Sequence, residues 1–369
     1  MVATAASIAA LLGAATVGSA QAAPRTGALS AACATAVRAA DSADMAYATC
    51  QNWSAATAEA DAATAAPTSA SASTEPAYCS VSTSEGKIFE TRYNACGTYL
   101  GTLDVIDAKT REVVGALTFT AQMFVQSSKS SGEWTFDLTV RKETSWGAAK
   151  GTVLTGGASC SAGCSVASGS FGTQPIDLRG VASAQWTMRT RLAAAPTGRV
   201  LSGTATASLR FQPPDALPST LAKVPTPTVR CDNKFARTIG CVLPDVAPVL
   251  IYSLSGPYPQ LAAHIRDAQS LGLPGKWDTS SYLTRLVNPT LQDKNRGKAC
   301  PTNLTRPPGD SCDEYPFAST YQGAYTGGGK FSRRMINATQ NSDGGVELGV
   351  FYNYNRIYDG DRFQVYIAA

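Results

Sequence analysis

The sequence of 369 residues contains a single histidine and little excess of either charge, with 31 Lys and Arg against 27 Asp and Glu. A net charge of +4 is weak support for a polyanionic partner, so charge alone does not identify nucleic acid as a ligand. Cys160 and Cys164 stand near metal-ligand spacing, but no second close pair or nearby histidine completes a four-ligand set. This shortage argues against a structural zinc site.

The N-terminus has the pattern of an export signal. Residues 3–17 are apolar and rich in Ala, and Ala20-Gln21-Ala22-Ala23 is a small-residue cleavage site. No Lys or Arg precedes the apolar stretch, which is unusual for such a signal. We predict that residues 1–23 are a signal peptide, that the protein is secreted and extracellular, and that no membrane span remains after processing.

The ten cysteines form five close pairs along the sequence. An even number of cysteines agrees with an oxidising, extracellular destination. We predict five local disulfides, although spacing alone does not establish connectivity. The predicted pairs are Cys33–Cys50, Cys79–Cys96, Cys160–Cys164, Cys231–Cys241 and Cys300–Cys312.

The first half of the chain changes character at Cys79. Residues 24–78 are rich in Ala, which favours a partly helical and loosely held segment, and they end in a Ser/Thr/Ala-rich linker at 67–76. Residues 79–211 contain short runs that alternate apolar and polar residues, with Gly- and Ser-rich breaks between them. This pattern predicts an all-β domain, either a sandwich or a small barrel, of unknown role.

A second domain is predicted after a Pro-rich linker at 212–230. Residues 246–252 have the pattern of a strand, and residues 258–271 have apolar side chains at helical spacing followed by Gly272. We therefore assign residues 231–369 to an α+β domain.

A pair of acids, Asp313 and Glu314, lies between Cys312 and Pro316. A Cys300–Cys312 bridge and the proline would hold this segment rigid. Carboxylates and a hard divalent cation together supply what the hydrolysis of a phosphodiester needs, an activated water and stabilised phosphate oxygens. Asp313 and Glu314 are therefore candidate catalytic residues.

Further polar groups follow the acid pair. Residues 340–345 have the composition of a turn that leads into residues 346–352. Asn341 of the turn and Glu347 after it offer oxygen ligands for one cation, which suit Mg²⁺, Mn²⁺ or Ca²⁺. Residues 327–334 predict a loop in which Lys330, Arg333 and Arg334 could follow a DNA backbone. The glycines of that loop lack the spacing of a nucleotide P-loop.

Each of these features also has an ordinary structural interpretation. Acid pairs beside cysteines usually lie in solvated turns, Asn and Asp next to Gly usually form turns, and Lys/Arg loops usually aid solubility. His264 stands among apolar helix residues, where a packed and hydrogen-bonded histidine is more common than a ligand. Alone, these features do not establish an enzyme.

Three sequence blocks support an enzyme, because together, and in the order in which the family has them, they resemble the secreted NucA/NucB-type deoxyribonucleases. The resemblance runs from about Val246 to the C-terminus and does not extend to the β-rich region. The blocks are Tyr258-Pro-Gln-Leu-Ala-Ala-His-Ile-Arg-Asp-Ala268, Cys312-Asp-Glu-Tyr-Pro-Phe-Ala318, and Asn341-Ser-Asp-Gly-Gly-Val-Glu-Leu-Gly349 with Asp359-Gly-Asp-Arg-Phe-Gln-Val365.

The resemblance implies a reduced ββα-metal fold, in which an acid replaces the histidine base of related enzymes. Asp313 would then polarise or deprotonate the attacking water, and Glu314 would support it or bind metal. Asn341 and Glu347 would hold Mg²⁺ or Mn²⁺, although the family position of the carboxylate falls one helical turn away, at Phe351. Cys312 stands where shorter family members have a charged or polar residue.

The remaining implied roles concern DNA binding and support of the acids. Lys330, Arg333 and Arg334 would bind phosphates of the DNA substrate. His264 matches the family's helix histidine and is a candidate for orienting a site residue.

The function predicted from these observations is a secreted, metal-dependent DNA endonuclease with little sequence preference, because no recognition helix is visible. The alternative is a non-enzymatic envelope-binding or adhesion protein with a degenerate nuclease-like domain. In a third possibility, the β-rich domain delivers or restrains the nuclease, as in a toxin. The sequence does not choose between nutrient scavenging and attack on competitors, and a cognate inhibitor protein is a partner that it leaves open.

Overall fold

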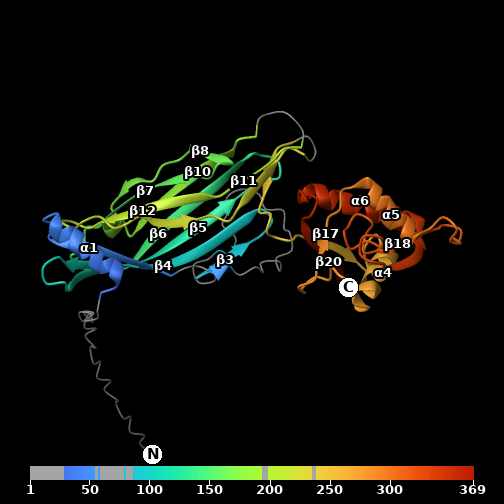
Figure 1. The fold of residues 1–369 in the computed structure, drawn as a ribbon, viewed down its shortest axis with the longest axis horizontal. Helices are drawn as coiled ribbons and strands as arrows, with labels where there is room; N and C mark the ends of the chain where they lie inside the picture. Colours follow the sequence, from blue (N-terminus) through green and yellow to red (C-terminus); the bar gives the residue numbers. More distant parts are fainter. Residues whose placement is uncertain (1–28, 55–56, 59–78, 80–85, 193–197, 235–237) are drawn as a thin grey trace, which may run out of the picture.

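The computed structural model describes residues 29–54, 57–58, 79, 86–192, 198–234 and 238–369. The predicted signal peptide and the predicted linker at 67–76 lie outside these residues. Figure 1 shows an elongated part built of strands, followed by a smaller C-terminal part that carries helices. None of the described helices has the length and apolar character needed to cross a membrane.

The largest sheet of the elongated part has eight strands in the order β2-β3-β4-β5-β6-β10-β8, with β1 paired to β4. The long strands β4, β5 and β6 pair antiparallel in succession and alternate buried with partly exposed residues, as the sequence pattern predicts. The strands are β1 Tyr47–Trp53, β2 Thr57–Ala58, β3 Lys87–Glu90, β4 Asn94–Asp107, β5 Val113–Gln126, β6 Glu133–Gly147, β8 Cys164–Ser168 and β10 Val181–Thr190.

Two smaller sheets complete this part. One has the order β13-β12-β7-β9 and the other β11-β14-β15. Their bounds are β7 Val153–Cys160, β9 Gly172–Gln174, β11 Val200–Gly203, β12 Ala205–Gln212, β13 Ala222–Pro225, β14 Val229–Asp232 and β15 Gly240–Val242, with the short helix α3 Ile176–Arg179.

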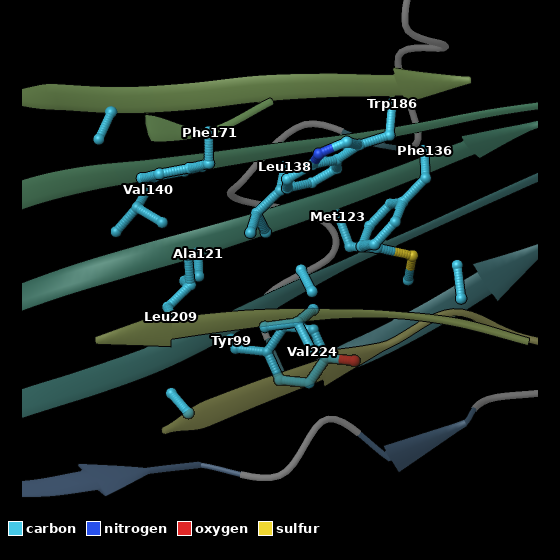
Figure 2. Close-up of a cluster of buried hydrophobic side chains, with 14 of the residues drawn as sticks. Tyr99, Ala121, Met123, Phe136, Leu138, Val140, Phe171, Trp186, Leu209 and Val224 are labelled. Carbon is cyan, nitrogen blue, oxygen red and sulfur yellow. The ribbon is translucent and has the colours of Figure 1, made fainter. Parts of the chain in front are cut away.

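The eight-stranded and four-stranded sheets pack face to face around one apolar core. Phe119 of β5 and Phe211 of β12 meet with ring centroids 4.7 Å apart, and Trp186 of β10 packs on Phe136 of β6. Figure 2 shows part of this core, including Phe136 and Trp186 of the larger sheet and Leu209 and Val224 of the smaller one. The arrangement is a sandwich, because alternate residues of each strand point into the shared core.

The described residues 29–54 pack on this sandwich, where the sequence predicted a partly helical and loosely held segment. Helix α1 Ala31–Ser42 begins at Ser30, whose side chain accepts a hydrogen bond from the Cys33 amide. Val37 and Ala40 of α1 pack against Ile106 of β4, and β1 pairs with β4 along its whole length.

The segment expected to be a Pro-rich linker at 212–230 instead contributes strands. Val224 of β13 and Val229 of β14 are buried in the sandwich core. Pro225 is compatible with β13 because this strand lies at the edge of its sheet. On the open side of an edge strand, an N–H group has no neighbouring strand to bond, so its absence removes no hydrogen bond from the sheet. Since β15 pairs with β14 and Leu243 is still in the core, we define the β module as residues 29–243.

The C-terminal domain, residues 248–369, has its own core around Phe351 and Phe363. Its sheet has the order β16-β20-β17, and β18 and β19 form a separate hairpin. Helix α4 ends before Gly272, which has a φ of +87°, as its sequence predicted. The elements are β16 Val249–Ser253, α4 Pro259–Ser270, β17 Leu283–Thr284, α5 Pro289–Ala299, β18 Asp310–Tyr315, β19 Ser332–Asn337, α6 Ala338–Tyr354 and β20 Arg362–Ala368.

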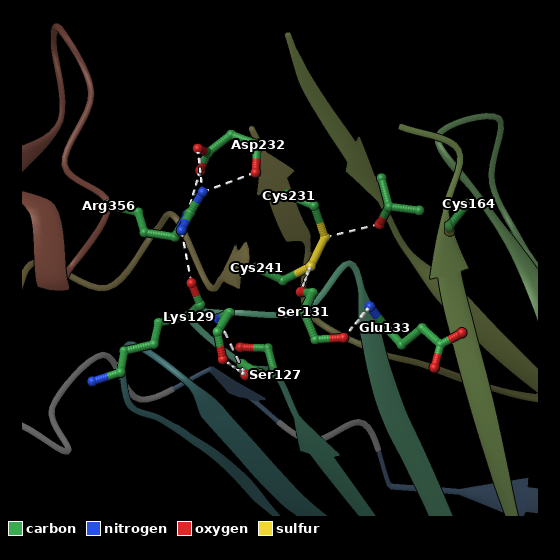
Figure 3. Close-up of a disulfide and its surroundings, with 12 residues drawn as sticks. Ser127, Lys129, Ser131, Glu133, Cys164, Cys231, Asp232, Cys241 and Arg356 are labelled. Atoms are coloured by element: carbon green, nitrogen blue, oxygen red, sulfur yellow. Dashed lines mark hydrogen bonds and ion pairs between the residues drawn. A yellow bond between two sulfur atoms is a disulfide. The ribbon is translucent and has the colours of Figure 1, made fainter. Parts of the chain in front are cut away.

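All five predicted disulfides are present, and the described residues contain no free cysteine. Four of them lie in the β module. Cys231–Cys241 joins β14 to β15 at the end of the module that faces the C-terminal domain (Figure 3). Cys300–Cys312 is the single bridge of the C-terminal domain within the part that the structure describes.

Candidate active site

The acid pair lies on the hairpin formed by β18 and β19, which leads directly into α6. Cys300 caps the end of α5, and its bridge to Cys312 holds α5 against β18. The next two residues of β18 are Asp313 and Glu314, which pair in register with Arg334 and Arg333 of β19. The disulfide therefore fixes the strand that carries both acids, as the sequence suggested.

Asp313 is buried and hydrogen-bonded to the only histidine. Its Oδ2 lies 2.6 Å from Nδ1 of His264 on α4, and Nε2 of the same ring lies 2.9 Å from Oγ of Ser332. Burial raises the pKa of Asp313, while the hydrogen bond and charge of His264 oppose the increase. The two hydrogen bonds fix the plane of the imidazole, so His264 orients Asp313.

Glu314 lies on the α5 side of the same strand. One of its oxygens is 3.7 Å from Sγ of Cys300, and it accepts a hydrogen bond from the Ala318 amide. Burial, followed by the nearby charge of Asp313, raises the pKa of Glu314 to about 7, and Arg296 acts in the opposite direction. Two acids thus share one site, and both hold their protons more tightly than acids in water do.

Asp313 and Glu314 line a cleft of about 660 Å³ between the hairpin, α5 and α6. Its wall combines polar side chains and small residues with two leucines and three aromatic rings. The side chains of Arg285, Arg296, Asn341 and Tyr352 also line it.

Asn341 lines this cleft, whereas Glu347 does not. The Asn341 Nδ2 donates hydrogen bonds to Oγ of Ser311 at 2.9 Å and to the carbonyl oxygen of Cys312 at 3.2 Å. No donor among the described residues reaches its Oδ1. Glu347 is exposed and absent from the cleft wall, so the structure does not bring the two expected metal ligands together.

The reason lies in the secondary structure of residues 340–345, which were expected to form a turn. They belong to α6 instead, and Gly344 allows this helix to pack closely on α4. A Cβ at Gly344 would lie 2.2 Å from Cδ2 of Leu261 on α4, so only a glycine fits this contact without a shift. The helix places residues 341, 345 and 349 in the cleft wall and leaves Glu347 out of it, although the charge of Glu347 acts on Tyr252, which lines the cleft.

The oxygen donors that do line the cleft suit a hydrated hard cation. The described residues contain no group of three His, Cys, Asp or Glu side chains able to hold a metal. The oxygen atoms in the cleft that could bind a cation are the carboxylates of Asp313 and Glu314 and the Oδ1 of Asn341. This set resembles the usual environment of Mg²⁺, which keeps several waters and binds through one or two carboxylates together with substrate phosphates.

The three cations expected to bind phosphate lie elsewhere. Lys330 precedes β19 and is exposed, and Arg333 and Arg334 are part of β19, so the predicted loop at 327–334 is in part a strand. Arg333 donates to the carbonyl oxygen of Ala299, and Arg334 pairs with Asp267 at 2.9 Å. None of the three lines the cleft.

Two other arginines line it, and sequence reasoning missed both. Arg296 lies on α5, whose start is marked by an Asn288 cap and a proline at the first position, signals that could have located the helix. Arg285 lies just after β17, and its guanidinium stacks on the ring of Tyr352, 3.8 Å from the centroid. Nothing in the local sequence identifies Arg285, because its position depends on contacts with distant segments.

Comparison with known families gives a match to part of the C-terminal domain. Residues 288–366 match the model of the family described as Deoxyribonuclease NucA/NucB. This match agrees with the resemblance of the second and third motif blocks, while the first block, 258–268, lies before the matched residues. The matched residues include both acids and Asn341, while His264 and Arg285 lie before them. A search of curated proteins found no match to the chain.

Proposed function

We propose that this protein is a secreted, metal-dependent endonuclease that hydrolyses DNA with little sequence preference. The observation that carries the proposal is the pairing of Asp313 with His264 beside Glu314, in a cleft that two arginines also line. The family match supports DNA as the substrate. The hairpin of β18 and β19 followed by α6 supports a reduced ββα-metal arrangement.

In the proposed reaction, a water molecule attacks the phosphorus atom, the bond from phosphorus to one sugar oxygen breaks, and that oxygen takes a proton from solvent. Asp313, oriented by His264, takes the proton that the water loses, and Glu314 supports it from the neighbouring position. Arg285 and Arg296 bind non-bridging phosphate oxygens, a geometry that the planar guanidinium favours. Contacts to phosphates carry no sequence information, which explains the expected lack of sequence preference.

A divalent cation, Mg²⁺ or Mn²⁺, would be held by Asn341 Oδ1 and one acid of the pair together with the substrate phosphate. When bound, it would stabilise the charge that develops on the phosphate and on the leaving oxygen. Asn341 fits this role because its amide nitrogen is anchored to Ser311 and Cys312, which leaves the oxygen available.

The extracellular location is supported by five disulfides, which persist in oxidising compartments. An enzyme that cleaves DNA endangers the cell that makes it. A cognate inhibitor in the producing cell is therefore a second proposed partner.

The test is cleavage of supercoiled plasmid DNA by the full chain, with Mg²⁺ or Mn²⁺ and with EDTA. Asp313→Asn is compared with Asp343→Asn, an exposed acid of α6 that does not line the cleft. We expect metal-dependent nicking that EDTA and Asp313→Asn abolish and Asp343→Asn preserves. If the folded chain leaves DNA intact with every metal, the nuclease proposal is wrong, and the adhesion alternative becomes the one to test on the β module.

A further inference from the structure

The two parts of the chain meet at the loop between α6 and β20, residues 355–361. Two arginines of the β module hold its Asp361. Arg230 donates to both carboxylate oxygens at 2.7 and 2.6 Å, and Arg92 donates to Oδ2 at 3.1 Å. Side-chain exposure is 5% for Arg92, 9% for Arg230 and 13% for Asp361, so solvent has little access to these ion pairs.

The charge state of Asp361 fits this environment. Burial would raise the pKa of Asp361, but the hydrogen bonds and charges of Arg230 and Arg92 outweigh it and lower the pKa below its usual range. The carboxylate therefore stays ionised and attached to both arginines at neutral pH.

A second buried ion pair fixes the same loop. Arg356 reaches into the β module, where its Nε and Nη2 donate to the two carboxylate oxygens of Asp232 at 2.8 and 2.6 Å (Figure 3). Its Nη1 donates to the carbonyl oxygen of Lys129 at 2.7 Å. Arg92 and Arg230 both donate to the backbone oxygen of Arg356 as well.

The opposite side of this loop holds the backbone of Arg285. The Arg285 amide donates to the carbonyl oxygen of Asp361 at 2.9 Å, and the Gly360 amide donates to the carbonyl oxygen of Arg285 at 2.9 Å. Asp359 adds a third bond, because its Oδ1 accepts from the Val287 amide at 2.9 Å. The carboxylate of Asp361 is thus held by the β module, and its backbone is hydrogen-bonded to Arg285, which lines the cleft.

In the part of the chain that the structure describes, the side chain of Arg285 has no counter-charge. Among the described residues, no Asp or Glu forms an ion pair with it, and its buried Nε has no hydrogen-bond partner. The guanidinium stacks on Tyr352, whose hydroxyl lies 2.9 Å from Oγ of Ser319, and all three residues line the cleft. A cation held in this way in the cleft that the two acids line suits an anionic ligand such as a phosphodiester.

We propose that the β module is a positioning part of the nuclease. Arg230 and Arg92, acting through Asp361, fix the backbone of Arg285 so that its guanidinium binds a phosphate of the DNA in the cleft. The proposal rests on the proposed function for its substrate. It gives the β module a role in DNA binding that requires no ligand of its own.

The experiment measures binding of a short fluorescein-labelled DNA duplex by fluorescence anisotropy. The full chain is used in EDTA, so that binding is measured without cleavage. The variants are Arg285→Gln, Arg230→Gln and the double variant. The control is Arg189→Gln, which breaks the exposed pair with Glu133 elsewhere on the β module.

We expect Arg285→Gln and Arg230→Gln each to weaken DNA binding about tenfold. Arg285→Gln should also reduce the salt dependence of binding by an amount that corresponds to about one phosphate contact. Because Arg230 acts through Arg285, the double variant should bind no more weakly than Arg285→Gln alone. In Mg²⁺, Arg230→Gln should raise KM far more than it lowers kcat. Additive losses, or wild-type binding by Arg230→Gln, would overturn the proposal.

A second measurement covers the case in which Arg230→Gln does not fold. Hydrogen exchange is followed in the wild-type chain with and without the duplex. The proposal requires DNA to slow exchange of the Arg285 and Gly360 amides, whereas protection of the hairpin amides alone would contradict it. The two proposals can fail separately. If the chain does not cleave plasmid DNA but the binding losses of the two variants are non-additive, the catalytic proposal is wrong, and the coupling of Arg230 to Arg285 stands.

Discussion

His264 on α4 and Asp313 on β18 lie 2.6 Å apart, nitrogen to oxygen, in the interior of the C-terminal domain. The second ring nitrogen bonds Ser332, so the histidine joins both strands of the hairpin to α4. A buried polar pair of this kind is costly unless both partners are satisfied. We interpret His264 as a positioning residue for the acid and not as the base.

His264→Gln tests this interpretation. Glutamine cannot reproduce the spacing between the two ring nitrogens, so Asp313 loses its orientation. We expect kcat to fall by about 10- to 100-fold, as for other residues that orient site ligands. Ser332→Ala is the matched control, because it removes the hydrogen bond at Nε2 and leaves the one to Asp313. Equal loss in both variants, or wild-type cleavage by His264→Gln, would argue that the histidine only stabilises the fold.

The pH dependence of cleavage follows from the raised pKa values of Asp313 and Glu314. An acid that accepts a proton from water must first be ionised, so activity should rise with pH. The pKa of Glu314 is raised to about 7 by burial and by Asp313, so the increase should extend to near neutral pH and then level off. The two carboxyl groups titrate as a coupled pair, and kcat/KM measured from pH 5 to about 9 reports the pair.

A bound cation would favour the ionised acids, so a higher Mg²⁺ concentration should move this midpoint to lower pH. Glu314→Gln removes one of the two titrating groups and should simplify the profile. A rate that is independent of pH across this range would contradict the roles proposed for the acids.

The metal ligands can be separated by comparing Asn341→Ala with Glu347→Gln. Asn341 lines the cleft with its Oδ1 available, whereas Glu347 is exposed outside it. We expect Asn341→Ala to raise the Mg²⁺ concentration for half-maximal cleavage by about 10-fold or more, and Glu347→Gln to leave it unchanged. If Glu347→Gln raised this Mg²⁺ concentration and Asn341→Ala did not, Glu347 would be the metal ligand. The helix α6 would then have to rotate to bring Glu347 into the cleft.

Some features of this protein could be predicted from its sequence because they depend on nearby residues. The five disulfides join cysteines that are close in sequence, and α4 ends at Gly272 where a left-handed residue is needed. The rigid placement of the acid pair after Cys312 also follows from local chemistry.

The errors occur where distant contacts override local preference. Residues 340–345 favour a turn by composition, yet the packing of Gly344 on Leu261 keeps them in α6. Pro225 indicated a linker, but an edge strand accepts it. Arg285 gave no sequence signal, because segments near Tyr352 and Asp361 place it.

The stability of the junction at low pH should depend on Asp361. Its pKa is lowered in the folded state, so its contribution is present above the unfolded value of about 3.9 and is lost as the pH falls through the folded value. Asp361→Asn should lower the free energy of unfolding by about 3 to 5 kcal/mol at neutral pH, because it leaves two buried arginines without a counter-charge. The variant should also lose less stability than the wild type on acidification.

Chemical denaturation at several pH values measures both effects, with the exposed Asp343→Asn as control. The idea fails if Asp361→Asn and wild type lose stability in parallel as the pH falls.

Two adjacent glycines of α6 provide a matched test of how the helix packs beside the cleft. A Cβ at Gly344 would lie 2.2 Å from Leu261, whereas a Cβ at Gly345 meets no atom within 4 Å. Gly344→Ala should therefore cost about 1 to 3 kcal/mol through overpacking against a buried leucine. Gly345→Ala should stabilise the domain by up to about 1 kcal/mol, because alanine is the better helix residue.

Urea denaturation of the two variants distinguishes a helix from a turn at this position. If residues 340–345 formed the turn that their composition suggests, the two variants would not change the free energy of unfolding in opposite directions. The effect of Gly344→Ala would also not depend on Leu261. Restoration of stability in Gly344→Ala by Leu261→Ala would identify the α4–α6 contact as the cause.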